Sequence, residues 1–242
     1  MIFKTLLLRM MYPGRYSSDV YIKTLKEKFH IDIGSHCKFF APRETSIDTQ
    51  RPHMLHIGDY VKFTSGVTVL CHDYSRSTFV NMTEGVYSNV GEAKFTYIGD
   101  NVFLGINAIV LMGAHIGNNC VVGAGSVVAG SFPNGVVIAG NPAKIICTID
   151  EFYEKRKKQE IDAAKNYVKK WREKYGKNPS IYDMTNAFSW LYLPHTKETM
   201  EQYSQLFLTS AVDEETYLQN YYGTSPLYES FEDFLKDCGD CT

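Results

Sequence analysis

The residue best suited to acid–base chemistry in this sequence is His72, in the segment Val69-Leu-Cys-His-Asp-Tyr-Ser-Arg76. Histidine has an unperturbed pKa of about 6.5, so a neutral imidazole is available near physiological pH to accept a proton. His72 also lies where a regular pattern of apolar residues, described below, is interrupted. We therefore predict that His72 is a general base rather than a surface histidine at a turn.

Two residues that follow His72 add a carboxylate and a guanidinium group. Asp73 is a candidate for orienting the imidazole or binding a hydroxyl group, although aspartate is equally suited to a turn. We assign Asp73 and Arg76 to substrate binding. The other six histidines belong to no comparable cluster and are expected to be structural or solvent-exposed: His30, His36, His53, His56, His115 and His195.

The elements that must position His72 are indicated by a repeat of six residues. An aliphatic residue occurs at every sixth position from Ile98 to Val128, and the same frame holds at Ile57, Phe63 and Val69 and, more weakly, from Ile33. Neither the 3.6-residue period of a helix nor the alternation of a strand gives a period of six. A solenoid does, because three blocks of one short strand and one corner complete a turn. Within most blocks the fifth residue is small and also points inward: Val102, Ala108, Ala114, Cys120 and Ser126.

The repeat is interrupted once and stops before the C-terminal third. Val69 and Ile98 are 29 residues apart, which is no multiple of six, so we predict an excursion loop over about residues 73–97. Thr148-Ile-Asp-Glu151 is a capping box that opens a helix. We therefore divide the chain into a helical lead-in (1–30), a β-helical domain (31–147) and a helical subdomain (148–242), which we expect to pack against the β-helix.

Composition narrows the class of protein. The 242 residues have a formal net charge of −2 and are 44% hydrophobic, which is ordinary for a soluble globular protein and argues against nucleic-acid binding. No apolar run approaches the roughly 20 residues of a membrane span, so we expect no membrane insertion. Six cysteines lack a disulfide-framework spacing, so we expect reduced thiols and a cytoplasmic protein. The C-terminal Cys238-Gly-Asp-Cys241 has no second ligand pair nearby, and no metal site is expected.

Three motifs resemble those of the hexapeptide-repeat acyltransferases, in particular the galactoside, maltose and polysaccharide O-acetyltransferases. The resemblance extends over about residues 30–147. It implies a mainly β fold, namely a left-handed parallel β-helix, here with an α-helical C-terminal appendage. It also implies acetyl-CoA as the donor and a homotrimer with sites between adjacent subunits. The motifs are Ile98-Gly-Asp-Asn-Val-Phe-Leu-Gly105, Val122-Gly-Ala-Gly-Ser-Val-Val128 and Pro133-Asn-Gly-Val-Val-Ile-Ala-Gly-Asn-Pro-Ala-Lys-Ile145.

The resemblance also implies roles for individual residues. It places the catalytic histidine just before the excursion loop, at His72, and a supporting carboxylate in the loop, for which Glu92 is the candidate and Glu84 the reserve. Asp48 falls near a substrate-binding aspartate of the galactoside group. The positions that match coenzyme contacts are Phe103, Ile106, Ala124, Ala129, Gly130 and Lys144, the last of which would meet a phosphate group.

Three positions depart from the family pattern. Phe103 replaces a tryptophan and keeps an apolar face without the indole N–H group. Phe40 stands where the galactoside group has an asparagine that stabilises the oxyanion, so a backbone amide would have to do so here. Cys147 replaces an arginine near the adenosine phosphate.

Together these features favour a coenzyme-A-dependent O-acetyltransferase that acts on a hydroxyl group of a sugar or polysaccharide precursor. One alternative is N-acylation of a nucleotide-linked amino sugar, but the 30 residues before the solenoid cannot form the nucleotide-binding domain that such enzymes often carry. A carbonic anhydrase of the same fold needs three converging histidines, and only His115 follows the loop within the solenoid. A non-enzymatic β-helical scaffold is the remaining alternative.

Overall fold

The structure is a computed structural model that describes residues 7, 8, 10–207 and 212–239. The chain forms two compact units, residues 1–152 and 153–242, which are described separately. Cys241 of the C-terminal cysteine pair lies outside the described residues. In the part of the chain that the structure describes, no helix is both long and apolar enough to cross a membrane.

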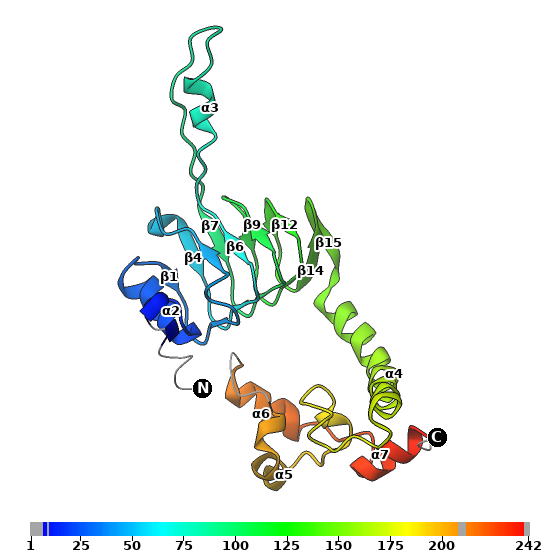
Figure 1. Ribbon diagram of the computed structural model, residues 1–242. Helices are drawn as coiled ribbons and strands as arrows, with labels where there is room; N and C mark the ends of the chain where they lie inside the picture. The colour runs from blue at the N-terminus through cyan, green and yellow to red at the C-terminus, as the bar shows by residue number, and fades with distance from the viewer. Residues whose placement is uncertain (1–6, 9, 208–211, 240–242) are drawn as a thin grey trace. The chain divides into compact units, whose positions relative to one another are not determined.

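The first unit is a left-handed parallel β-helix with three sheets, in which each strand lies beside the strand three positions earlier (Figure 1). Its final strand, β15, is the exception and pairs antiparallel with β14. Sheet A contains β1 (Asp32–Ile33), β4 (Leu55–Ile57), β7 (Thr96–Ile98), β10 (His115–Ile116) and β13 (Ser131–Phe132). Sheet B contains β2 (Lys38–Phe39), β5 (Lys62–Phe63), β8 (Phe103–Leu104), β11 (Val121–Val122), β14 (Val136–Gly140) and β15 (Ala143–Thr148). Sheet C contains β3 (Ser46–Ile47), β6 (Thr68–Val69), β9 (Ile109–Val110) and β12 (Val127–Val128).

Successive sets of three strands form coils 1 to 4, from β1–β3 to β10–β12, and their core confirms the predicted repeat. Every aliphatic residue of the frame from Ile98 to Val128 is fully buried, and so are the small residues between them. Coil 1 follows a different spacing. Its inward residues Ile33, Phe39 and Ile47 precede Ile57 by steps of six, eight and ten residues, so two of its corners are longer than the repeat predicts.

One corner of each coil explains why glycine and then aspartate or asparagine follow the aliphatic residue. The backbone N–H of Asp100 donates to Asn118 Oδ1 at 2.9 Å, and the N–H of Asn118 donates to Asn134 Oδ1 at 2.8 Å. A Cβ atom built on Gly99 would lie 2.3 Å from Asn118 Oδ1, so the ladder requires a residue without a side chain there. The motif thus binds one coil to the next through polar groups at the corner.

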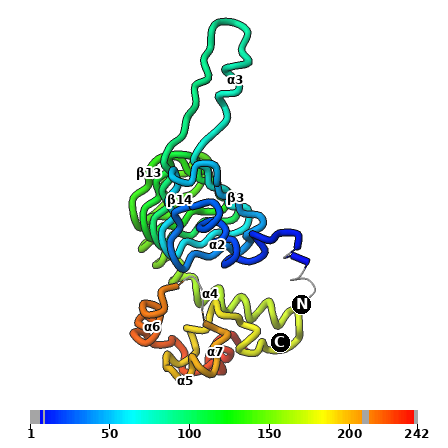
Figure 2. Tube along the Cα trace, turned by 90° about the vertical axis from the view of Figure 1, so that its left-hand side faces the viewer, coloured from blue at the N-terminus to red at the C-terminus, as the bar shows by residue number. Residues whose placement is uncertain are grey.

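A helix and an arm complete the first unit. Helix α2 (Ser18–Glu27) packs Tyr21 and Leu25 into the same apolar core as Ile33 and Phe39, which covers the first coil. Between β6 and β7 the chain leaves the β-helix as an arm, residues 72–95, which contains α3 (Arg76–Val80) and returns at a bridge between His72 and Ala93 (Figures 1 and 2). The predicted excursion therefore exists. A short 3-10 helix, η1 (Pro52–Met54), precedes β4.

The second unit is helical and has its own core. The predicted capping box opens α4 (Ile149–Tyr175), because Thr148 N donates to Glu151 and Glu151 N donates to Thr148 Oγ1. Gly176 ends the helix with a φ of 64°. Ala164 and Val168 of α4 are fully buried against the elements that follow. These are η2 (Ser189–Leu191), α5 (Lys197–Gln202), η3 (Ser204–Leu206), α6 (Glu214–Tyr222) and α7 (Phe231–Asp237).

Substitution of Gly99 tests the corner ladder. We expect Gly99→Ala to lower the free energy of unfolding by about 1–3 kcal/mol, because the new methyl group overlaps Asn118 and the backbone of Gly117. Gly91→Ala is the matched control, since a Cβ there meets only Arg76 at 3.7 Å; it should change stability by less than about 0.5 kcal/mol. Urea denaturation monitored by circular dichroism measures both. Equal stability of the two variants would contradict this role for the ladder.

Candidate active site

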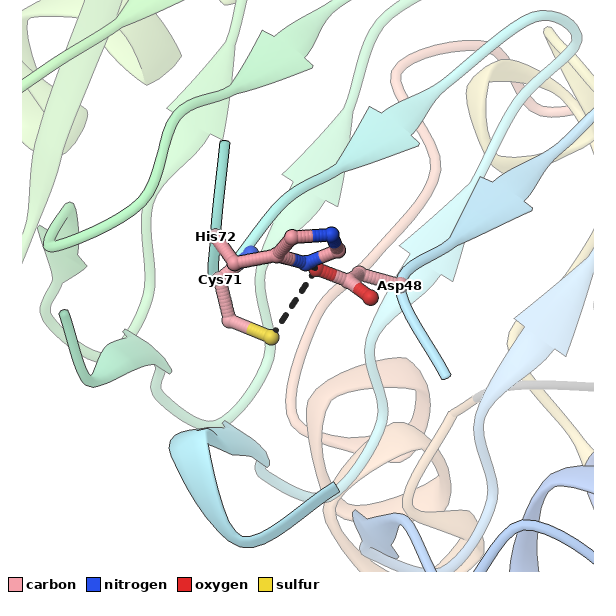
Figure 3. A group of neighbouring side chains, drawn as sticks. All are labelled: Asp48, Cys71 and His72. Carbon is pink, nitrogen blue, oxygen red and sulfur yellow. Dashed lines mark hydrogen bonds and ion pairs between the residues drawn. The ribbon is translucent and has the colours of Figure 1, made fainter. Parts of the chain in front are cut away.

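Asp48, Cys71 and His72 meet on one edge of the β-helix, between sheets C and A (Figure 3). We call this the C–A edge; it consists of residues 48–54 of coil 1, 70–95 of coil 2, 111–114 of coil 3 and 129–130 of coil 4. Asp48 directly follows β3, and Cys71 comes two residues after β6. Because Ile47 pairs with Val69 in these neighbouring strands, the residues after them are brought together across the two coils.

The Asp48 carboxylate is the centre of this cluster. Its side chain is only 3% exposed, so it needs hydrogen-bond donors to remain ionised. The backbone N–H and the thiol of Cys71 each donate to Asp48 Oδ2 at 3.1 Å. His72 Nδ1 is hydrogen-bonded to the same oxygen, and because an ionised carboxylate can only accept, we assign the proton to Nδ1. The N–H of Gln50 donates to Oδ1 at 3.0 Å. Four donors therefore satisfy both oxygens.

The same contacts determine the protonation states of the cluster. Burial opposes ionisation of Asp48, but hydrogen bonds from the Cys71 thiol, the Gln50 and Cys71 amides and His72 outweigh it and lower the pKa of the carboxyl below its usual 3.8. The resulting stabilisation is complete above pH 3.8 and is lost as the pH falls through the lower folded-state pKa. Burial and the neighbouring Asp48 raise the pKa of the Cys71 thiol to about 12, so the thiol stays protonated and acts as a donor.

The arrangement leaves one nitrogen of His72 available for chemistry. With Nδ1–H directed at an ionised carboxylate, the neutral imidazole carries its lone pair on Nε2. Nε2 forms no hydrogen bond with any residue that the structure describes, and the His72 side chain is 9% exposed. Such a histidine can accept a proton at Nε2, while the carboxylate stabilises the imidazolium that forms.

The three ligand-type atoms also lie within 4.8 Å of one another, which is close enough to hold a metal ion. Coordination by Cys71 would require the thiol to lose the proton that it donates to Asp48. It would also compete with the hydrogen bonds by which Cys71 and His72 already satisfy Asp48. The donor set therefore fits a hydrogen-bonded pair better than a resident metal site.

Comparison with known proteins shows the family of the chain. Residues 96–129 match the family described as the hexapeptide repeat of succinyl-transferase. Protein CapG of Staphylococcus aureus is 39% identical over 145 residues, which cover 59% of this chain and 81% of CapG. The chain belongs to the hexapeptide-repeat acetyltransferase family.

Two further relatives of this acetyltransferase are named for their activity or ligand. The galactoside O-acetyltransferase of Lactococcus lactis is 33% identical over 112 residues, covering 45% of this chain and 52% of the relative. The chain thus spans about half the length of that enzyme. A hexapeptide-repeat acetyltransferase from Vibrio cholerae, solved with acetyl-CoA, is 25% identical with a TM-score of 0.41, covering 49% of this chain and 60% of that one.

Of the residues predicted for the acceptor site, Asp48 lies against His72, whereas Glu92 and Asp73 make other contacts. Glu92, predicted to support His72, instead pairs with Lys94 in the exposed arm, and Asp48 occupies the expected position of that carboxylate. Glu92 is displaced because the arm returns to the C–A edge at Ala93, with the Glu92 side chain outward. Asp73 accepts hydrogen bonds from Ser75 N and Oγ, which is the turn role considered above.

The residues predicted to contact acetyl-CoA lie on two edges of the β-helix and on one of its sheets. Ala129 and Gly130 follow β12 on the C–A edge, where Gly130 is open enough that a Cβ atom would meet nothing within 4 Å. Ile106 and Ala124 instead lie on the edge between sheets B and C, in consecutive coils. The remaining two are exposed on sheet B: Phe103 in β8 and Lys144 in β15.

Cys71 is the one residue of the cluster for which no role was predicted. Its only sequence signal is its place directly before His72, and its buried hydrogen bonds to Asp48 depend on the pairing of β3 with β6. Arg51 contributes its carbonyl oxygen, 3.5 Å from Cys71 Sγ. Both residues help to hold Asp48 and its neighbours in place.

Replacement of Asp48 tests the cluster. We expect Asp48→Asn to lower kcat by roughly 10²-fold or more, because an amide neither fixes the Nδ1–H tautomer nor stabilises the imidazolium. The KM for acetyl-CoA should hardly change. The matched control is Asp32→Asn, because the exposed Asp32 binds Nδ1 of the half-buried His56 at 2.6 Å with the same separation of 24 residues. A similar loss of kcat in both variants would indicate a structural effect and contradict the catalytic role.

Proposed function

We propose that this acetyltransferase transfers the acetyl group of acetyl-CoA to a hydroxyl group of a sugar or of a polysaccharide precursor. The observation that carries the proposal is the Asp48–His72 pair, which leaves Nε2 of His72 as a base on the C–A edge. The same edge contains the open Gly130 position that the family resemblance assigns to the donor. The galactoside O-acetyltransferase among the relatives supports a sugar acceptor.

The reaction would be a direct transfer. His72 Nε2 takes the proton of the acceptor hydroxyl as its oxygen attacks the thioester carbonyl carbon. The C–S bond then breaks, and the imidazolium returns the proton to the departing thiolate of coenzyme A. Asp48 keeps its negative charge throughout and stabilises the imidazolium. Backbone N–H groups would hold the negative charge on the carbonyl oxygen, because the exposed Phe40 side chain has no donor.

The base favours an oxygen rather than a nitrogen acceptor. A hydroxyl group is a weak nucleophile until its proton is removed, so it benefits most from a base held against a buried carboxylate. A neutral amine attacks through its own lone pair and gains less from such a base. N-acylation of an amino sugar therefore remains the second candidate.

A homotrimer would bring the separated donor positions together. Ile106 and Ala124 lie on a different edge from Ala129, Gly130 and His72, so a donor that meets both groups would lie between two copies of the chain. The arm also exposes apolar side chains that a monomer would leave in water, which suits a contact with a neighbouring copy. These are Tyr74, Phe79, Val80, Met82, Val86, Tyr87, Val90 and Phe95.

The first test of this function removes the base. His72→Ala should lower turnover of acetyl-CoA with an acceptor by roughly 10²–10⁴-fold, with little change in the affinity for coenzyme A, because only proton transfer is lost. His56→Ala is the matched control, since His56 also binds an aspartate through Nδ1 but lies outside the cluster. Release of the coenzyme A thiol measures both. Turnover near that of the wild type in His72→Ala would remove the proposed mechanism.

A second test concerns the donor. Lys144→Ala should raise the KM for acetyl-CoA by roughly 10-fold and leave kcat unchanged, because the resemblance places this exposed lysine against a phosphate of the donor. Acetyl-dephospho-CoA lacks the 3′-phosphate and provides the control. With that donor the wild type and the variant should have the same KM. If the variant is impaired equally with both donors, Lys144 does not bind the 3′-phosphate.

A further inference from the structure

The side chains beside His72 form a small platform from two segments of the chain. The ring of Tyr74 meets the imidazole edge-on, with 5.0 Å between the ring centroids. The Tyr74 hydroxyl donates to Gln50 Oε1. This hydrogen bond links the start of the arm to the turn that follows Asp48. Arg76 places its guanidinium carbon 5.2 Å from the centroid of the same ring. Tyr74 thus holds a cation in the neighbourhood of the base.

No carboxylate of the described residues balances the charge of this cation. Every nearby carboxylate already has other donors: Asp48 binds His72 and Cys71, Asp73 binds Ser75, and Glu92 binds Lys94. Among the described residues, no carboxylate lies within ion-pair distance of Arg76 or of Arg51. Arg51 follows Gln50 and contacts Cys71 through its carbonyl oxygen. Two half-buried arginines therefore flank the cluster without a partner of opposite charge.

An unpaired guanidinium next to a reacting hydroxyl can select an acceptor. Arginine presents a planar fork of N–H donors that binds the two oxygens of a carboxylate, or those of a phosphate, in parallel. An aromatic ring such as Tyr74 stacks with the apolar face of a ring-shaped ligand and keeps the fork in position. A neutral sugar would satisfy neither arginine.

We propose that the acceptor is an anionic sugar, which carries a carboxylate or phosphate oxyanion that Arg76 binds while His72 deprotonates a hydroxyl group on the same sugar. This inference rests on the proposed function, since it names the substrate class of that site. The guanidinium of Arg76 fixes the oxyanion, Tyr74 supports the sugar ring, and Nε2 of His72 receives the hydroxyl proton. Arg51 adds a second positive charge on the same edge.

The experiment compares three acceptors that differ only at C6: methyl galactoside, the methyl glycoside of galacturonic acid and methyl galactoside 6-phosphate. In the wild type, kcat/KM should be at least roughly 10-fold higher for one of the two anionic sugars than for the neutral sugar, as expected for a charge-assisted hydrogen bond. The preferred anion identifies whether the oxyanion is a carboxylate or a phosphate. Equal or lower kcat/KM for both anionic sugars would overturn the proposal.

Variants connect the preference to the residue. Arg76→Gln should abolish the preference through a higher KM for the anionic sugar, with the KM for acetyl-CoA unchanged, and Arg76→Lys should restore part of it. Lys94→Gln removes the same charge from the same arm, but from a lysine that is already paired with Glu92, so it should keep the preference. A rise in the KM for acetyl-CoA alone in Arg76→Gln would assign the guanidinium to the donor phosphates and overturn the proposal.

One further outcome separates this proposal from the proposed function. In this outcome the wild type hydrolyses acetyl-CoA, His72→Ala does not, and the anionic sugars are neither acetylated nor inhibitory. That result would contradict the proposed acceptor class and would still support His72 as the base. Absence of any turnover that depends on His72 contradicts the proposed function itself.

Discussion

The register between coils 1 and 2 is the constraint on which the active site depends. Asp48 and His72 are 24 residues apart and come from different coils, and the hydrogen bond between them exists because β3 pairs with β6. Between these two coils, the corner hydrogen bond from Ser35 N to Asp59 Oδ1 and the buried apolar column hold that register by polar and apolar contacts respectively. A rigid solenoid therefore supplies what a catalytic pair needs, which is two side chains held at a fixed separation.

The geometry also explains why the chain leaves the solenoid where it does. The coil ends at the buried Cys71, whose thiol and amide both bind Asp48, and His72 is the first residue of the arm. The arm then carries Tyr74 and Arg76 past the imidazole before it returns at Ala93. His72, Asp48 and Arg76 thus all lie on the C–A edge. In the proposed reaction, the solenoid supplies the proton-transfer pair, and the arm supplies the groups that we propose to select the acceptor.

The sequence predicted the β-helix well and the details of the site only in part. Coils 3 and 4 keep a strict six-residue frame, so the buried positions from Ile98 to Val128 could be read directly. Coil 1 has longer corners, which hide the alignment of Ile47 with Val69, so the contact between Asp48 and His72 could not be predicted from the repeat. The expected roles of Glu92 and Asp48 came instead from the family resemblance. The capping box predicted α4. Helix α7 begins after Ser230, whose hydroxyl accepts a hydrogen bond from Asp233 N. Helix α6 was not predicted.

The tautomer of His72 is the most direct test of this account. Histidine-selective ¹⁵N labelling, with the His72 signal assigned by its absence in His72→Ala, reports by NMR which ring nitrogen carries the proton in the neutral enzyme. We expect the neutral imidazole of His72 to carry its proton on Nδ1, directed at Asp48, and none on Nε2. A His72 that is protonated on Nε2 could not accept a proton from the acceptor, and that result would contradict the central claim.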